Sequence, residues 1–394
     1  MEIKAKKWVL VYLILVLVPI IMLIGAFWAY DPLQLYHKPW GRPATFNTNM
    51  RIQAAGIIRN HDFDSIILGT SIMENYSSKE VGKRLSGNFV NISISAGDYF
   101  ERARVLGFLF KIKNIRNVVY SLDSVYMNTR AGYSLFPYPT YEYLYDNNQL
   151  NDIRVYLNHF YIKCLSTWSA DGDCVGFTPD LNRPNAWSGD NENLRRFGGL
   201  DKWCAASGNY LMQDSIGKIR QAGQAVATGS VLRFTEEQVG QRVASALTYV
   251  DKYVIHFVKA NPETRFYFVF PPYSRVQYAI WYQYRTINSF IHAAVLRHLA
   301  MEASRLPNMQ VFGFENEAYS DDIANYMDIV HAHPDHDAYL LASLASGRGC
   351  LTLANVESYI EESKQKGLGY DLVGLGKKLD QCARPALGQG DRHG

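Results

Sequence analysis

The sequence lacks the features that mark several common protein classes. It contains no G-x-x-x-x-G-K-[ST] loop, which argues against a nucleotide-driven enzyme. Its formal charge is only +3, and lysines and arginines are interspersed with aspartates and glutamates, so no basic stripe indicates a nucleic-acid partner. Because 48% of its 394 residues are hydrophobic, the chain can bury a large core and is not expected to be disordered.

Cysteine is scarce, and its number is odd. The five cysteines form no C-x-x-C pair, and at least one thiol must remain unpaired within the chain. An oxidising compartment would permit two of the first three cysteines to pair, and Cys350 to pair with Cys382. Free buried cysteines that behave as small hydrophobes are the open alternative. The full set is Cys164, Cys174, Cys204, Cys350 and Cys382.

Charge is absent from Trp8 to Tyr30, and this run is long enough to cross about 30 Å of hydrocarbon as a helix. Three lysines precede the run and Asp31 follows it, so residues 1–7 are expected in the cytoplasm and the rest of the chain outside it. A cleaved signal peptide would have a shorter apolar region and a small-residue cleavage site, which AFWAYDP does not offer. Residues 8–30 therefore predict an uncleaved, single-pass anchor.

After the anchor, residues 31–48 read as a Pro- and Gly-punctuated linker, and residues 31–60 together form the linker and the entry to a domain at residues 61–370. Short apolar runs alternate with helix-like stretches there, which predicts an α/β domain with a mainly parallel sheet and ligands at the carboxyl ends of its strands. The expected strands are 65–69, 89–94, 117–122, 265–270 and 309–314, and the expected helices are 78–85, 101–113, 236–259 and 286–305.

Residues 124–234 break this alternation and are rich in Tyr, Trp, Asn and Gly, which indicates an insertion. Its aromatic side chains could form a platform for a sugar or lipid, but a satellite core is the favoured interpretation. Residues 371–394 read as a flexible tail.

Two short motifs carry candidate chemistry. Ser71 lies in a Gly-Thr-Ser turn after the first strand, where a nucleophile would be exposed near backbone N–H groups, although such a turn alone is ordinary. It lacks the second glycine of the G-x-S-x-G elbow. Asp328 and His331 lie three residues apart beyond the last strand, so the acid could hold the tautomer of the base.

Together these motifs resemble the SGNH (GDSL-like) hydrolase superfamily over most of residues 60–340. FDSIILGTSIMENY, SISAGDYFE, VVYSLDS, VFPPYS and NYMDIVHAHPD look like successive blocks of a membrane-anchored bacterial SGNH-like group. The resemblance implies a flavodoxin-like, three-layer sandwich in which Ser71 is the nucleophile, His331 the general base and Asp328 its orienting acid.

By the same resemblance, the backbone N–H groups of Ser71 and Gly97 would hold the oxyanion. Thr70 replaces the acidic residue of the GDS turn, a mild change. Asp123 stands where the superfamily often places an oxyanion-hole Asn, yet an ionised carboxylate only accepts hydrogen bonds. Either Asp123 has a structural role or the oxyanion hole is built differently.

The resemblance implies a serine acyl-ester hydrolase or O-acyltransferase without a cofactor, anchored in the bacterial cytoplasmic membrane with its main domain periplasmic or extracellular. The expected substrate is an acyl ester, of an acetyl group above all, on an envelope or exported polysaccharide. A membrane-bound O-acyltransferase is a candidate partner. A catalytically inactive glycan-binding or scaffold protein of the same shape is the alternative.

A second alternative is a zinc hydrolase, because H-x-H-x-D-H is a zinc-binding pattern. Its ligands would be His331, His333, Asp335 and His336, but a complete site needs further histidines downstream. Three histidines on apolar helical stretches are expected to be satisfied core or surface residues: His256, His292 and His298.

Overall fold

The computed structural model describes residues 2–124, 127 and 141–382. Its centre is a five-stranded parallel sheet of order β2-β1-β3-β4-β5, the flavodoxin-like order. The predicted parallel α/β sheet is confirmed, with each strand within a few residues of its expected bounds. The strands are β1 (Ser65–Leu68), β2 (Phe89–Asn91), β3 (Asn117–Ser121), β4 (Arg265–Phe270) and β5 (Met309–Gly313).

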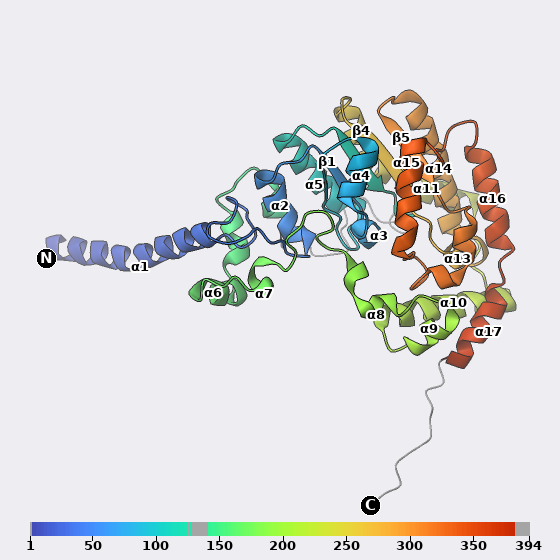
Figure 1. Cartoon of the computed structure of the whole chain (residues 1–394), viewed down its shortest axis with the longest axis horizontal. Coiled ribbons are helices and arrows are strands. Elements are labelled where there is room, and N and C mark those ends of the chain that lie inside the picture. The colour runs from blue at the N-terminus through green and yellow to red at the C-terminus, as the bar shows by residue number, and fades with distance from the viewer. Residues whose placement is uncertain (1, 125–126, 128–140, 383–394) are drawn as a thin grey trace, which may run out of the picture.

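Helices cover both faces of the sheet, because alternate strand residues are buried on opposite sides. Ile66 and Val118 pack into the larger core, and Ile67 and Val119 into the smaller one. The larger core is closed by α2 (Met50–Asn60), α5 (Tyr99–Ile112), α11 (Glu236–Val250), α14 (Thr286–Arg305) and α16 (Val356–Leu368), and the smaller one by α4 (Ser78–Leu85) and α15 (Asp337–Ser346). The domain thus has three layers (Figure 1).

The predicted insertion is helical in the part that the structure describes. It contains α6 (His159–Ser166), α7 (Gly172–Val175), α8 (Asn191–Leu194), α9 (Leu200–Ala205) and α10 (Tyr210–Thr228). Four of its tyrosines are buried in the larger core: Tyr141, Tyr145, Tyr156 and Tyr161. The run YSLFPYPT, residues 133–140, lies outside the described residues. The satellite-core interpretation is therefore confirmed only in part, because Trp187 and Tyr210 line a cleft instead.

One helix, α1 (Glu2–Tyr30), contains a segment long and apolar enough to cross a membrane, from Lys6 to Tyr30. It projects from the domain, with its far end well away from every other element (Figure 1). The helix does not end in a loose linker. Phe27, Tyr30 and Asp31 are at most 3% exposed, so the last turn of α1 belongs to the core of the domain.

Asp31 explains why the predicted linker is in fact well packed. Its carboxylate accepts backbone hydrogen bonds from Leu35, Tyr36 and His37, at 2.7–3.0 Å, and a hydrogen bond from the Tyr156 hydroxyl at 2.6 Å. Burial raises the pKa of Asp31, while these four hydrogen bonds lower it. The expectation of a loose linker at residues 31–48 is wrong, because the buried Asp31 carboxylate organises a packed turn there without any apolar periodicity.

The expected flexible tail is also wrong over residues 371–382. Leu372, Leu375 and Leu379 of α17 (Leu372–Cys382) are buried against α9, α10 and α13 (Arg275–Gln283). Residues 383–394 lie outside the described part of the chain.

Two of the first three cysteines pair, as predicted, in the disulfide Cys164–Cys174. Cys204 is disulfide-bonded as well. Cys350 is free, so the predicted Cys350–Cys382 bond is wrong. The two cysteines belong to different parts of the fold. The backbone of Cys350 forms a β-bridge with Phe312 of β5, whereas Cys382 ends α17, which packs on α10.

Candidate active site

Ser71 is the first residue of α3 (Ser71–Glu74), directly after β1. The preceding Thr70 caps this helix: its hydroxyl accepts a hydrogen bond from the backbone N–H of Ile72 at 3.4 Å. Gly69 allows the chain after β1 to pass close to the end of β3, because a Cβ atom at this position would lie 2.5 Å from Oγ of Ser121. The turn therefore presents Ser71 at the carboxyl edge of the sheet, beside the β1–β3 switch point of the strand order.

The loop of residues 326–332 carries the other two predicted residues to the same place. An antiparallel bridge between Tyr326 and Ala332 closes it. The hydroxyl of Ser274 donates to the carbonyl of Ile329 at 2.7 Å, and the indole N–H of Trp203 donates to the carbonyl of Tyr326 at 2.9 Å. These contacts join the loop to α13 and to the insertion.

The three predicted residues form one hydrogen-bonded chain. Oγ of Ser71 lies 2.8 Å from Nε2 of His331, and Nδ1 of His331 lies 2.7 Å from Oδ2 of Asp328. Oδ1 of Asp328 accepts the backbone N–H groups of Val330 and His331, each at 2.9 Å. The spacing of three residues therefore places acid and base as predicted.

Burial alone would raise the pKa of Asp328, but His331 and the backbone hydrogen bonds outweigh it and lower that pKa to about 2. Asp328 is thus an ionised orienting group at neutral pH. An ionised acid on Nδ1 favours the tautomer in which Nε2 of His331 is free to accept the proton of Ser71.

Gly97 does not take the predicted role in an oxyanion hole. Its backbone N–H donates to the carbonyl of Ile94 at 2.8 Å, and Gly97 does not line the cleft. Its neighbour Ala96 does line the cleft, with a positive φ of 52°. The turn after β2 therefore uses the Gly97 N–H for a hydrogen bond within the turn, and the preceding residue, Ala96, lines the cleft.

Asp123 lines the cleft, but both oxygens of its carboxylate make structural contacts. Its Oδ1 accepts the hydroxyl of Thr70 at 2.8 Å, and its Oδ2 accepts the hydroxyl of Ser121 at 2.5 Å. The same Oδ2 lies 3.3 Å from Nη1 of Arg102, in a pair whose side chains are 0% and 1% exposed. The carboxylate holds the Thr70 turn and is neutralised by Arg102, so it is not the predicted oxyanion donor.

Ser71 and His331 open into a cleft of about 680 Å³. The insertion supplies one wall, which sequence reasoning missed. Trp187 donates its indole N–H to the carbonyl of Ser71 at 2.8 Å, and its ring meets that of His331 edge-on at 5.7 Å. No motif marked Trp187; only its place in the aromatic-rich insertion could have suggested it. Trp281 and Tyr273 line another part of the cleft.

Glu74 is a second residue that sequence reasoning missed. It lines the cleft, is 3% exposed, and accepts a hydrogen bond from Nδ2 of Asn185 at 2.7 Å. Burial raises the pKa of Glu74 to about 8, against a smaller lowering by the hydroxyl of Ser95. Its carboxyl group is therefore largely protonated at neutral pH and adds little negative charge near Ser71.

No protein-family model matches the chain, and no curated protein matches its sequence. The geometry and chemistry of the cleft therefore carry the functional argument.

The alternative zinc ligands do not converge. His331 is engaged with Ser71 and Asp328, the ring of His333 contacts Phe197 at 4.6 Å, and the ring of His336 stacks on Tyr319 at 3.7 Å. Burial lowers the pKa of His336 to about 4. Across the described residues, no group of three or more His, Cys, Asp or Glu side chains is arranged to hold a metal ion, so Asp335 has no metal-binding set to join.

A second serine–histidine contact lies outside the cleft. Oγ of Ser124 is 3.0 Å from Nδ1 of His292, and Nε2 of His292 is 2.7 Å from Oε2 of Glu315. His292 and Glu315 are 2% and 0% exposed. The expectation of a satisfied core histidine is confirmed for His292, and Ser124 offers a natural control for Ser71.

Proposed function

We propose that the protein is a membrane-anchored, SGNH-like serine acyl-ester hydrolase or O-acyltransferase. One observation carries the proposal: the unbroken hydrogen-bonded chain from Ser71 through His331 to Asp328, open to a cleft at the carboxyl edge of a parallel sheet. The flavodoxin-like strand order and the resemblance of the Gly-Thr-Ser and D-x-x-H blocks support the SGNH assignment.

The proposed reaction has two steps. Oγ of Ser71 attacks the acyl carbonyl carbon while Nε2 of His331 takes its proton, and collapse of the tetrahedral intermediate expels the alcohol, which receives that proton. Water or a sugar hydroxyl then gives its proton to His331 and attacks the acyl-serine. Collapse of this second intermediate breaks the bond between the acyl carbon and Oγ, Ser71 takes the proton back from His331, and the free acid or the acylated sugar leaves. Asp328 keeps the imidazole oriented and stabilises the imidazolium form.

The backbone N–H groups of Ser71 and Ala96 are the proposed oxyanion donors. Ser71 is at the first position of α3, where a backbone N–H has no partner within the helix. Ala96 lines the same cleft from the turn after β2. Two such donors stabilise the developing negative charge, and the neutral state of Glu74 avoids repelling it.

The proposed substrate is an acyl ester, acetyl above all, on an envelope or exported polysaccharide. Trp187 and Tyr210, which is 74% exposed, give the cleft aromatic surfaces on which sugar rings can stack, whereas Tyr273 and Trp281 line it with side chains only 1% and 2% exposed. The anchor α1 and the Cys164–Cys174 disulfide support a location outside the bacterial cytoplasm, with the N-terminus inside. A membrane-bound O-acyltransferase would be the donor of acyl groups in the transferase case.

The test compares p-nitrophenyl acetate hydrolysis by the full chain in detergent with that of Ser71→Ala and His331→Ala. We expect both variants to lose activity and to lose labelling by a fluorophosphonate probe. Ser124→Ala is the matched control, because Ser124 also contacts a histidine but lies outside the cleft; it should keep both. Absence of hydrolysis and labelling in folded natural protein would favour the inactive glycan-binding alternative. Labelling of Ser124 instead of Ser71 would show that Ser71 is not the nucleophile.

A further inference from the structure

The exposed part of α1 is about as long as a bilayer's hydrocarbon core is thick, and the helix enters the domain directly after it. Side chains of α1 are exposed from Lys6 to Gly25, whereas Phe27 is fully buried. From Trp8 to Ala26 the helix spans about 28 Å at roughly 1.5 Å per residue, close to the hydrocarbon thickness of about 30 Å. If α1 crosses a membrane, the domain therefore begins where the hydrocarbon ends, with no spacer between them.

The junction between α1 and the domain is stiff as well as short. Asp31 caps the turn after α1 with three backbone hydrogen bonds. The hydroxyl of Tyr30 donates to the carbonyl of Ser169 at 2.6 Å, and its ring lies 5.3 Å from that of Trp168. The domain cannot tilt away from the bilayer without breaking these contacts.

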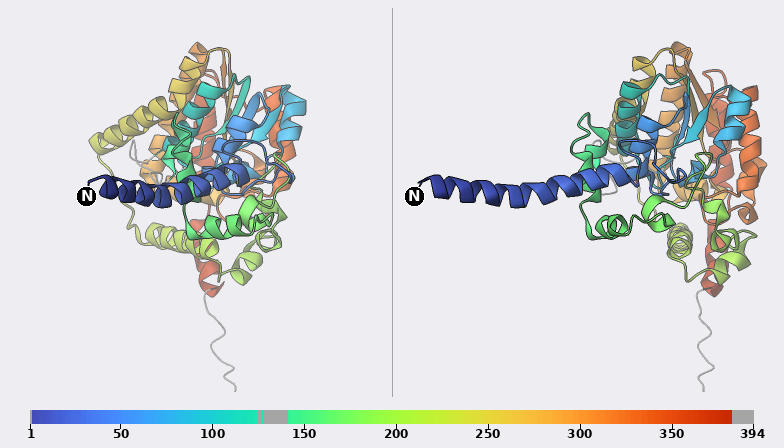
Figure 2. Two further views of the ribbon diagram at one scale, coloured as in Figure 1. Left: turned by 90° about the vertical axis from the view of Figure 1, so that its left-hand side faces the viewer. Right: turned by 60° about the vertical axis from the view of Figure 1, so that its left-hand side comes forward.

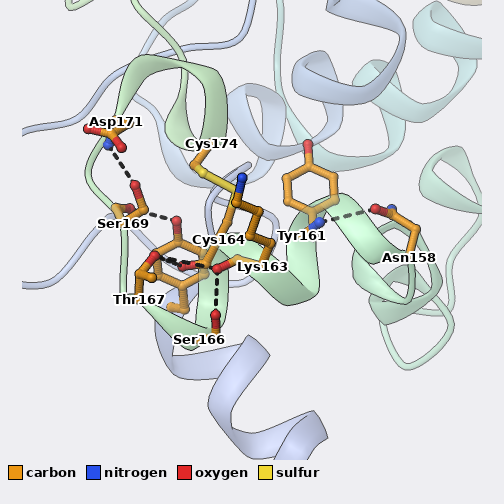
Figure 3. Close-up of a disulfide and its surroundings, with 10 residues drawn as sticks. Asn158, Tyr161, Lys163, Cys164, Ser166, Thr167, Ser169, Asp171 and Cys174 are labelled. Carbon is orange, nitrogen blue, oxygen red and sulfur yellow. Dashed lines mark hydrogen bonds between the residues drawn. A yellow bond between two sulfur atoms is a disulfide. The ribbon is translucent and has the colours of Figure 1, made fainter.

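The segment of residues 157–177, which carries α6 and α7, lies beside the exit of α1, where Tyr30 contacts Trp168. The views in Figure 1 and in the right panel of Figure 2 both place it on the side of the domain from which α1 leaves. The disulfide Cys164–Cys174 braces it, and hydroxyls of Ser166 and Thr167 close the turn after α6 (Figure 3).

This segment exposes large apolar side chains although a disulfide and several hydrogen bonds hold its backbone in place. We call four of these residues the α6 patch: Leu157, Phe160, Trp168 and Phe177, which are 49%, 46%, 54% and 70% exposed. Ile162 is 44% exposed but follows Phe160 by two residues on α6, so it lies on a different side of the helix. At the exit of α1, Trp28 and Trp40 are 46% and 57% exposed and pack edge to face at 5.2 Å. Exposed aromatic side chains are enriched at membrane interfaces.

We propose that the α6 patch is a second membrane contact, which lies in the headgroup region beside α1 and fixes the orientation of the catalytic domain. The occupant is the lipid bilayer itself, because the patch is continuous with the apolar helix through Tyr30 and Trp168. Tyr30 is four residues beyond Ala26, about 6 Å along the axis, which is the depth of the headgroup layer. The proposal rests on α1 crossing the membrane and is independent of the serine mechanism.

The test uses the full chain in phosphatidylcholine liposomes, with the photoreactive residue p-benzoylphenylalanine placed at one position at a time. Phe160 is compared with Phe290, which is similarly exposed at 50% but belongs to α14, on the other side of the domain in Figure 1. Leu15 of α1 reports insertion of the anchor. We expect lipid adducts at Leu15 and Phe160 and several-fold less at Phe290.

Adducts at Leu15 with equally low yields at Phe160 and Phe290 would overturn the proposal while leaving the anchor in place. No adduct at Leu15 would overturn its premise that α1 crosses the membrane. A second measurement needs no foreign residue. Lipids brominated in the upper acyl chain should quench the fluorescence of Trp168, so the quenched fraction of tryptophan fluorescence should be larger in the natural chain than in Trp168→Phe. An identical quenched fraction in both proteins would also overturn the proposal.

Discussion

The buried pair of Asp123 and Arg102 allows a direct test of how the turn that bears Ser71 is held in place. Asp123→Asn keeps the shape of the side chain but removes the charge that pairs with Arg102, whose side chain is 0% exposed. Breaking a buried ion pair on one side costs about 3–5 kcal/mol. The variant should also loosen Thr70, which donates to Asp123 and caps the turn that bears Ser71.

This cost translates into a measurable shift of the melting temperature. For 394 residues, an unfolding entropy of about 2.1 cal/mol/K per residue gives roughly 0.8 kcal/mol/K, so Asp123→Asn should lower the Tm by about 4–6 °C. Glu357→Gln is the matched control, because Glu357 pairs with Arg297 at 2.7 Å but the two side chains are 65% and 49% exposed. It should shift the Tm by no more than about 1 °C.

The assay is thermal unfolding of the full chain in detergent, followed by circular dichroism, together with hydrolysis of p-nitrophenyl acetate well below the Tm. We expect a lower Tm and unchanged or lower activity in Asp123→Asn. If Asp123 instead repelled the oxyanion, Asn would donate a hydrogen bond there and raise the rate. An unchanged Tm with faster hydrolysis would refute the structural role.

Three further predictions concern the site and the anchor. Asp328→Asn should lower kcat by up to about 10⁴-fold, because the amide favours the wrong tautomer of His331; a loss below tenfold in single-turnover measurements would contradict this. Glu74 has a folded pKa raised to about 8, so its contribution to stability is full below about pH 4.5 and is lost as the pH rises through about 8. Glu74→Gln should therefore melt less pH-dependently than the natural chain between pH 5 and 8, and parallel Tm curves would disprove it. A chain that starts at Pro32 lacks the buried Phe27 and Tyr30 and should lose several kcal/mol of unfolding free energy relative to one that starts at Gly25; equal urea midpoints would show that the α1 junction is not part of the core.

The sequence by itself determined the elements whose signal is local. Four strands end within one residue of the predicted limit, and two helices match it at both ends, because buried apolar runs and caps such as Ser77 act within a few residues. The D-x-x-H spacing likewise determined the contact of Asp328 with His331, since three residues on one turn place both side chains together. The apolar run of α1 needed only its own length and lack of charge.

Only the tertiary structure decided the contacts made across long sequence separations. It joined Ser71 to His331, 260 residues apart, and brought Trp187 of the insertion over both. It placed Arg102 beside Asp123 as an ion-pair partner. The turn after β2 also engages the backbone N–H of Gly97 in a hydrogen bond to Ile94. The tertiary structure also made the stretch after α1 part of the core. Burial and pairing of polar groups depend on which distant segments pack together, and no local pattern in a single sequence carries that information.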